Sequence, residues 1–211
     1  MGTLLAVNVA VPREIKRRGR PVRTGIWKFP VEGRVRVRGV NVEGDEQADR
    51  SVHGGPDKAV YAYAREDYDW WEGELGRVMD PGTFGENLTV AGMGVSRAEV
   101  GERWRVGGAL LEVSEPRLPC WKLGVKMDDP RFLKRFSKAL RPGAYLRIVE
   151  EGELGAGDPI DLVERPGHGI TMELLARAYL ADHELAPEIL AAPALSDGWR
   201  EWAQKAATYA A

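Results

Sequence analysis

Apolar and polar residues alternate in many short segments over the first 165 residues of the chain. Val35 and Val37, for example, alternate with three arginines, and glycines separate this run from its neighbours. Successive side chains of a strand point to opposite faces, so this alternation is typical of half-buried strands. The pattern predicts strands over residues 4–11, 34–38, 58–63, 102–106, 109–113, 145–149 and 159–163.

Two helical segments interrupt these strands. The first is expected around residues 66–75, where no glycine or proline breaks the run before Gly73. The second is expected to begin with Asp129 as its N-cap and to bury Phe132 and Phe136 on one face. Many short strands with few helices predict an α+β protein whose residues 1–165 form a barrel-like β domain.

The pattern changes in the last segment, residues 166–211. Glycine becomes scarce, alanine and leucine dominate, and apolar residues recur at helical spacing. Helices this short are marginal alone, so we expect them to pack on the barrel as a small three-helix subdomain that largely buries Trp199 and Trp202. The three helices are predicted to begin after Thr171, near Pro187 and after Ser196.

Several classes of protein are disfavoured by simple counts. The longest apolar stretch, near residues 4–11, is far below the ~18 residues that a membrane-spanning helix needs. The N-terminus has no basic region before an apolar core, so it does not resemble a secretory signal. The single cysteine, Cys120, cannot form an internal disulfide, which fits a reducing compartment. We therefore expect a cytoplasmic protein without a membrane partner.

Charged residues are segregated along the chain. Residues 1–38 carry ten basic and two acidic side chains, and residues 117–149 carry nine and two. If the fold joins these segments, their field favours an anionic ligand, whereas the alternative is a solvated surface of mixed charge. A pI of ≈ 6.0 and the lack of a motif that interleaves aromatic with basic residues argue against an RNA-binding barrel.

The lone cysteine follows a predicted apolar strand. Pro116 and Pro119 cannot extend a central ladder, so they place Cys120 on a stiffened loop at the end of that strand. Arg117 and Lys122 would favour the thiolate, which attacks electrophiles and binds soft metals. The alternative is a small buried hydrophobic residue without chemical function.

A second polar loop leads into the predicted strand at 58–63. It contains His53, whose imidazole can donate to an anion or move protons, although a loop tied together by its own carboxylates is an equal alternative. Residues 91–96 lack the third glycine of a dinucleotide-binding fingerprint, and residues 54–58 are not a Walker loop. The three histidines match no zinc-ligand spacing.

Seven short motifs follow one another along the chain. They are Thr24–Lys28, Gly44–Asp49, His53–Val60, Phe84–Leu88, Glu115–Cys120, Gly143–Tyr145 and Gly157–Asp158. This ordered set resembles the MOSC family, which is named for the C-terminal domain of molybdenum-cofactor sulfurases. The three-helix tail is similar to that of the family's bacterial YiiM-like branch, so the resemblance covers essentially the whole chain.

The resemblance implies a barrel that binds the molybdenum cofactor, a pterin whose dithiolene holds molybdenum and whose phosphate is anionic. It also implies a reductase of N-hydroxylated small molecules, such as hydroxylaminopurines, that receives its electrons from an external donor reductase. A non-catalytic carrier of the cofactor or of sulfur is the alternative. Nucleic acid is not an expected partner, and either a monomer or a homodimer is compatible with the resemblance.

Residue roles follow from the same resemblance. Cys120 matches the family cysteine that supplies a thiolate to the metal and takes part in catalysis. His53 and Asp49 are the matching candidates for moving protons as the hydroxyl leaves as water. The candidate cofactor-binding residues are Lys28, Lys58, Asn87, Arg117 and Thr24.

Overall fold

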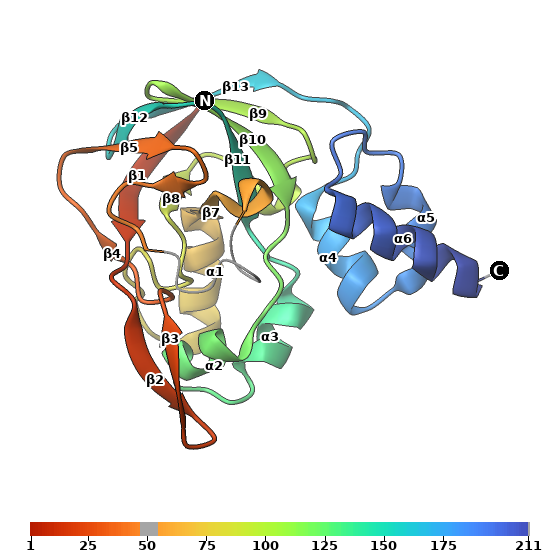
Figure 1. The fold of residues 1–211 in the computed structure, drawn as a ribbon, viewed down its shortest axis with the longest axis horizontal. Helices are drawn as coiled ribbons and strands as arrows, with labels where there is room; N and C mark the ends of the chain where they lie inside the picture. Colours follow the sequence, from red (N-terminus) through yellow and green to blue (C-terminus); the bar gives the residue numbers. More distant parts are fainter. Residues whose placement is uncertain (47–54, 211) are drawn as a thin grey trace.

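A closed β-barrel forms the body of the molecule, as the computed structural model, which describes residues 1–46 and 55–210, shows (Figure 1). Its strands are β1 (Gly2–Val9), β7 (Val60–Ala64), β8 (Leu88–Ala91), β9 (Arg103–Val106), β10 (Ala109–Glu115), β11 (Ala144–Glu150) and β13 (Pro159–Glu164). They pair in the order β13-β9-β10-β11-β7-β8-β1, and β13 also pairs with β1, which closes the barrel. The pairing of β7 with β8 is parallel, and the other pairings are antiparallel.

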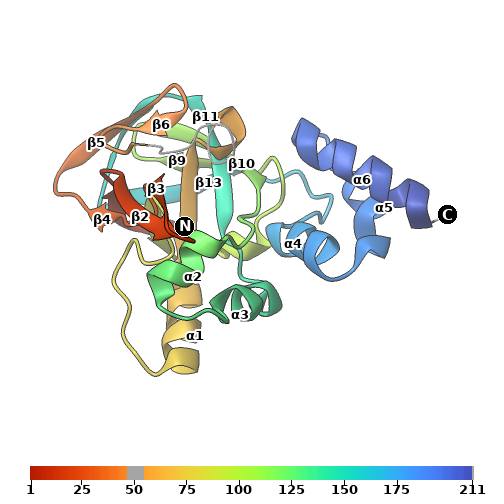
Figure 2. The same ribbon diagram turned by 60° about the horizontal axis from the view of Figure 1, so that its bottom comes forward.

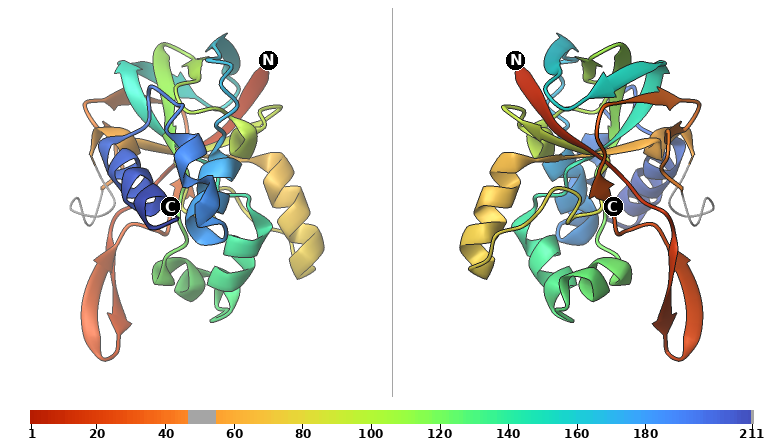
Figure 3. Two further views of the ribbon diagram at one scale, coloured as in Figure 1. Left: turned by 90° about the vertical axis from the view of Figure 1, so that its right-hand side faces the viewer. Right: turned by 90° about the vertical axis from the view of Figure 1, so that its left-hand side faces the viewer.

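Smaller ribbons are attached to this barrel. The short strand β4 (Phe29–Pro30) extends the sheet beyond β1, and a separate three-stranded sheet has the order β12-β5-β6. A two-stranded hairpin projects from the barrel, as Figures 1 and 3 show. The bounds of these strands are β2 (Arg13–Arg17) and β3 (Arg20–Thr24) for the hairpin, and β5 (Arg34–Arg38), β6 (Asn41–Val42) and β12 (Gly152–Gly155) for the sheet.

Strand β7 lies between two apolar clusters, because side chains alternate across it. Val60 and Ala62 point into the barrel core, whereas Tyr61 and Tyr63 belong to an aromatic cluster on the barrel's outer face. This cluster is covered by three helices, visible below the barrel in Figure 2. They are α1 (Arg65–Leu75), α2 (Trp121–Met127) and α3 (Phe132–Ala139).

The ends of these helices follow local chemistry. Helix α1 ends at Gly76, whose φ of 64° is the left-handed conformation that glycine adopts at helix C-termini. Helix α3 was expected to begin directly after Asp129, and this was wrong: it begins at Phe132. The Asp129 carboxylate instead accepts a hydrogen bond from the Arg131 backbone N–H at 2.8 Å, which forms a turn before the helix.

The C-terminal segment folds into helices α4 (Met172–Leu180), α5 (Ala186–Ile189) and α6 (Asp197–Ala210), with a 3₁₀ turn at His183–Leu185. The Thr171 hydroxyl caps α4 by accepting from the Leu174 N–H at 3.2 Å. Trp199 is buried and Trp202 half-buried, as expected, whereas Tyr179 is 40% exposed. These helices share one apolar cluster with the barrel, so the domain division at residue 165 stays a prediction.

The predicted strand positions are confirmed apart from small shifts, and the α+β class with a β-barrel is confirmed. Lys58 is the main local difference: it ends a 3₁₀ turn, η1 (Pro56–Lys58), instead of opening a strand. Strand β8, helix α2 and the β2–β3 hairpin were not predicted. Within the described residues, no helix is long and apolar enough to cross a membrane.

Candidate functional site

A cavity lies against the outer face of β7 and β11, where several connecting segments of the barrel meet. Tyr61 and Tyr145, which are cross-strand partners, form its back wall. The cavity has a volume of about 100 Å³. The remaining lining residues are Thr24, Gly25, Ile26, Lys28, Asp45, Glu46, Lys58, Gly85, Asn87, Arg117, Cys120 and Lys122.

Lys28 and Asp45 form a buried ion pair on one side of the cavity. The same Asp45 carboxylate accepts hydrogen bonds from the Ala10 backbone N–H at 2.8 Å and from the Asn87 amide at 2.9 Å. Burial lowers the pKa of Lys28 below its ordinary value, although the neighbouring Asp45 opposes this shift. These contacts hold the pair in place. Because the Lys28 side chain is already ordered, binding a ligand in the cavity would cost little of its conformational entropy.

Asn87 joins two barrel strands at this point. Its side-chain oxygen accepts from the Tyr61 N–H at 3.1 Å, and its amide group donates to the Asn8 carbonyl at 3.2 Å as well as to Asp45. Both amide hydrogens are thus donated to protein acceptors. The geometry makes Asn87 a residue that positions Lys28 through Asp45, and its predicted contact with a cofactor stays a prediction.

Arg117 lies beneath the cavity and is only 6% exposed. Its guanidinium donates to the Phe84 carbonyl and lies 5.4 Å from the centre of the Tyr61 ring. Burial raises the pKa of Tyr145 to about 12, although the positive charge of Arg117 opposes this shift, so both cavity tyrosines stay protonated near neutral pH. The cavity wall therefore offers cationic and neutral donor groups, which suit an anion.

Cys120 is half-buried and lines the cavity between β10 and α2. Strand β10 ends at Glu115, directly before Pro116, and α2 begins directly after the cysteine, as the position of the prolines led us to expect for the strand end. Lys122, in the first turn of α2, is 8% exposed and makes no ion pair or hydrogen bond with another described residue. A thiol and an unpaired buried ammonium thus line the same cavity.

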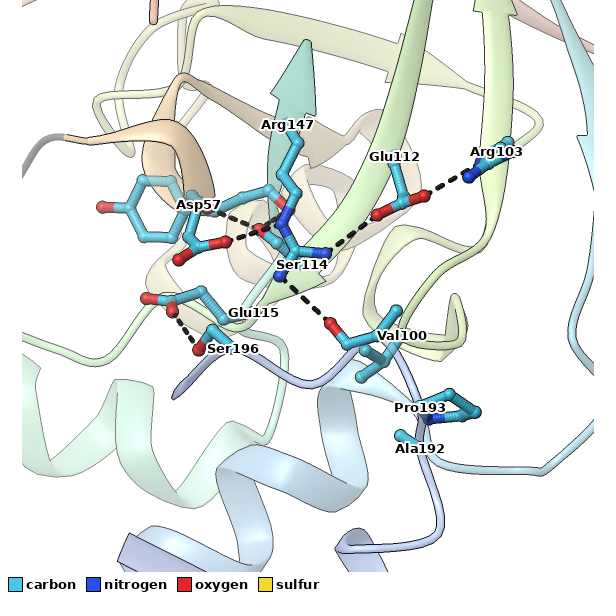
Figure 4. Close-up of polar contacts among 12 residues, drawn as sticks. Asp57, Val100, Arg103, Glu112, Ser114, Glu115, Arg147, Ala192, Pro193 and Ser196 are labelled. Carbon is cyan, nitrogen blue, oxygen red and sulfur yellow. Dashed lines mark hydrogen bonds and ion pairs between the residues drawn. The ribbon is translucent and has the colours of Figure 1, made fainter. Parts of the chain in front are cut away.

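Lys58 also lines the cavity and pairs with Glu115 at 3.1 Å. The second oxygen of Glu115 accepts from the Ser196 hydroxyl at 3.1 Å, a contact that reaches across to the C-terminal helices (Figure 4). Burial raises the pKa of Glu115, although the nearby Lys58 ammonium opposes this shift. One cavity lysine is therefore held through a residue of the tail.

Arg147 makes a second link between the tail and the same turn. Its guanidinium donates to the Asp57 carboxylate at 2.6 Å, to Glu112 at 2.8 Å and to the Ala194 carbonyl at 3.0 Å (Figure 4). Asp57 precedes Lys58 in the 3₁₀ turn. The C-terminal helices are thus tied both to the turn that carries Lys58 and to the carboxylate that pairs with it.

The predicted site residues can now be placed. Six of them line this one cavity, and the remaining two, His53 and Asp49, lie outside the described residues, so their roles stay predictions. Asp45, Glu115 and the two tyrosines were not predicted as site residues, because their positions depend on strand pairings and long-range contacts. The six residues that come together are Thr24, Lys28, Lys58, Asn87, Arg117 and Cys120.

A second, larger hollow of about 520 Å³ lies near the start of α1, beside Arg97 and Arg141. Three carboxylates also line it: Asp67, which pairs with Arg141 at 2.6 Å, together with Glu66 and Glu173. It holds neither a cysteine nor a lysine. Its three carboxylates outnumber its two arginines and it lacks a thiol, so it is a poorer candidate for an anionic, metal-containing ligand.

The closed barrel and the cysteine cavity define a class: a small barrel protein with a cavity that places several basic side chains beside a thiol. Comparison with known proteins identifies the family. The model of the MOSC domain matches residues 49–161. The chain is also 36% identical over 201 residues to the protein YflK of Bacillus subtilis, covering 94% of this chain and 91% of that protein. The chain belongs to the MOSC family.

Two further similarities refine this result. The crystal structure of YiiM from Geobacillus stearothermophilus has a TM-score of 0.80 and 32% identity, and the match covers 98% of this chain and 99% of that one. A protein of Gibberella moniliformis named "Reductase" is 38% identical over 152 residues, which are 70% of this chain but 27% of that longer protein. The chain is thus a YiiM-like MOSC protein, a class associated with the molybdenum cofactor.

Proposed function

We propose that this protein reduces N-hydroxylated compounds by means of a molybdenum cofactor held in the cysteine cavity. The observation that carries the proposal is the placement of the lone thiol, Cys120, in one cavity with the cations Lys28, Lys58, Arg117 and Lys122. A soft thiolate suits molybdenum, and buried cations suit a phosphate group. The relative named "Reductase" supports an oxidoreductase over a carrier.

The donor set of the cavity fits the cofactor. Cys120 would supply a sulfur ligand to the metal, and Lys122 and Arg117 would neutralise negative charge at little cost, because both are already desolvated by the fold. When bound, the cofactor supplies two-electron redox chemistry.

The proposed reaction is R–NHOH + 2 e⁻ + 2 H⁺ → R–NH₂ + H₂O. The N–O bond breaks, the nitrogen is reduced, and the oxygen leaves as water after protonation. The role of this chain's residues is to bind, orient and deliver protons; His53 and Asp49 are the proposed proton-transfer groups. Lys28 holds its ammonium against Asp45 and so provides a fixed positive charge beside the reacting group.

The test uses the full-length protein made in a host that supplies the cofactor. Molybdenum content, reduction of an N-hydroxylated purine with methyl viologen as donor, and alkylation of the thiol are measured on the same samples. Because Cys120 is the only cysteine, alkylation reports on this residue alone. We expect loaded wild type to turn over and to be protected from alkylation, and Cys120→Ser to lose turnover by at least 100-fold while keeping its fold.

The matched control is Ser137→Ala, a similarly small change on α3, away from the cavity. Near-normal turnover of Cys120→Ser with full molybdenum content would exclude the cysteine as the ligand. Wild type that binds molybdenum but never turns over would favour the carrier function instead.

A further inference from the structure

The β2–β3 hairpin forms its own two-stranded sheet and projects beyond the barrel (Figures 1 and 3). Residues 13–23 carry six basic side chains and one acidic side chain. All six basic residues are exposed, whereas Ile15 and Val22, paired across the strands, are half-buried. The hairpin is therefore a mostly charged surface with one half-buried apolar pair. It forms a sheet separate from the barrel, so the barrel closes without it.

The tip of the hairpin concentrates like charges. Arg17 and Arg20 are direct cross-strand partners, and Arg18 lies between them with a φ of 48°. Like charges placed directly opposite one another destabilise a strand pair. Arg18 and Arg20 make no ion pair with any other described residue, so the repulsion is not relieved within this part of the chain. An anionic partner would relieve it.

The hairpin lies beside the cysteine cavity, with contacts at its base and near its tip. Thr24, the last residue of β3, lines the cavity. The Arg17 guanidinium lies 4.6 Å from the centre of the Trp121 ring, and Trp121 follows Cys120 directly. Arg13 lies 3.6 Å from the centre of the Trp27 ring. These contacts fix the hairpin beside the cavity mouth, so a protein bound to it would sit next to Cys120.

The chemistry of the proposed reaction calls for such a partner. Each turnover consumes two electrons, and the chain has a single cysteine and no dinucleotide-binding fingerprint. The described residues contain no group of histidine, cysteine and carboxylate side chains suited to a metal relay. We infer that the arginine-rich β2–β3 hairpin is the docking surface for an acidic electron-donor protein, an inference that rests on the proposed function.

A protein partner fits the hairpin better than a nucleic acid does. Single-stranded nucleic acids are usually held by exposed aromatic side chains on which bases stack. The two indoles that contact the hairpin, Trp27 and Trp121, are half-buried and covered by arginines. Charge steering between a basic patch and an acidic protein, by contrast, needs no stacking surface and strengthens at low ionic strength.

The experiment compares two charge-reversal variants of the full-length, cofactor-loaded protein. Arg18→Glu/Arg20→Glu alters the hairpin tip, and Lys134→Glu/Lys138→Glu makes the same net change on exposed positions of α3. The probe is a flavodoxin, a small acidic flavin protein. Its binding is measured by calorimetry at two salt concentrations, and turnover is measured with reduced flavodoxin and, separately, with methyl viologen, which needs no docking surface.

We expect wild type to bind flavodoxin in a salt-dependent manner and the hairpin variant to bind at least tenfold more weakly, with a matching rise in the KM for flavodoxin. The α3 variant should change by less than twofold, and turnover with methyl viologen should be unchanged in both. Three results would overturn the inference. They are equal weakening of binding in the two variants, no binding of flavodoxin by wild type, and preferential binding of a single-stranded oligonucleotide. Absent turnover with methyl viologen in wild type would instead reject the proposed function, because the binding measurement does not depend on it.

Discussion

Two lysine–carboxylate pairs each contribute a lysine to the wall of the cavity, and they are built differently. The side chains of Lys28 and Asp45 are 10% and 3% exposed, and Asp45 is held by donors from the barrel itself. The side chains of Lys58 and Glu115 are 30% and 9% exposed, and Glu115 is held by Ser196 of the C-terminal segment. The first pair is fixed by Ala10 and Asn87, which adjoin barrel strands β1 and β8, and the second depends on the tail.

This difference separates two roles for buried charge. A fully buried pair is costly to break, because removing one partner leaves the other charge desolvated and uncompensated. A partly exposed pair is worth less, because water screens it and can replace the lost partner. The barrel pair should therefore dominate stability, while the tail-dependent pair should mainly tune where Lys58 lies and what it binds.

The largest effect is expected for Asp45→Asn, which removes the counter-charge of Lys28. We expect the free energy of unfolding to fall by about 3 kcal/mol, measured by urea denaturation. The exposed neighbouring variant Glu43→Gln should change it by less than about 0.5 kcal/mol. The double variant Asp45→Asn/Lys28→Met should recover much of the loss; if it is no more stable than Asp45→Asn, the buried-charge explanation is wrong.

A third lysine, Lys126, shows how a buried lysine behaves without a counter-charge. It has no carboxylate partner among the described residues. Lys126 donates to the carbonyls of Ile26 and Gly82, and burial lowers its pKa to about 7. Its folded-state pKa thus lies below the unfolded value, so the unfolded chain binds more protons between these values and stability rises with pH.

Between pH 7 and 9 the contribution of Lys126 should reach about 2 kcal/mol. The measurement is urea denaturation across this range for wild type and Lys126→Met, with the exposed Lys134→Met as the control. The rise should be smaller in Lys126→Met than in the other two proteins. Identical pH profiles of all three would contradict the assignment.

Glu115→Gln tests the second pair. Burial raises the folded-state pKa of Glu115, so the folded protein binds the extra proton and wild type gains stability as pH falls from neutral toward about 4.5. We expect the wild-type advantage over Glu115→Gln to grow over this range, measured by urea denaturation. The exposed Glu188→Gln variant is the control for loss of one charge. A shrinking wild-type advantage would reverse the assigned sign.

The smallest effect is expected for Ser196→Ala, which removes the tail's hydroxyl from Glu115. Loss of this hydrogen bond should cost about 1 kcal/mol of unfolding free energy and raise the pKa of Glu115 further, which carboxyl NMR detects. Ser137→Ala, whose hydroxyl donates to a carbonyl within α3, is the matched control and should leave the Glu115 titration unchanged. A shift of the same size in both variants would show that the tail contact is not specific.

Local pattern was sufficient to predict most barrel strands and the tail helices, because alternation and helical spacing record which face is buried. It failed for α2, a seven-residue helix between Pro119 and Asp128 that contains Gly124 and has little room for a periodic pattern. The hairpin was not predicted because each of its strands has a single half-buried apolar residue, Ile15 or Val22, among charged residues, which is too few to show alternation.

The candidate site was predictable only where residues stand in motifs. Cys120 and Arg117 could be found from the proline-flanked segment that carries them, and Lys28 and Asn87 from motifs similar to those of a known family. The pairing of Tyr61 with Tyr145, and the reach of Ser196 to Glu115 across 81 residues, left no trace in local sequence. Contacts of this kind depend on tertiary structure, which short-range pattern does not record.

The central claim is that Cys120 supplies a sulfur ligand to molybdenum in the cation-lined cavity. The most direct test is X-ray absorption at the molybdenum edge of loaded wild type and loaded Cys120→Ser. We expect one fewer sulfur scatterer around the metal in Cys120→Ser, replaced by a lighter atom. An unchanged number of sulfur scatterers, in a variant that retains its molybdenum, would contradict the claim.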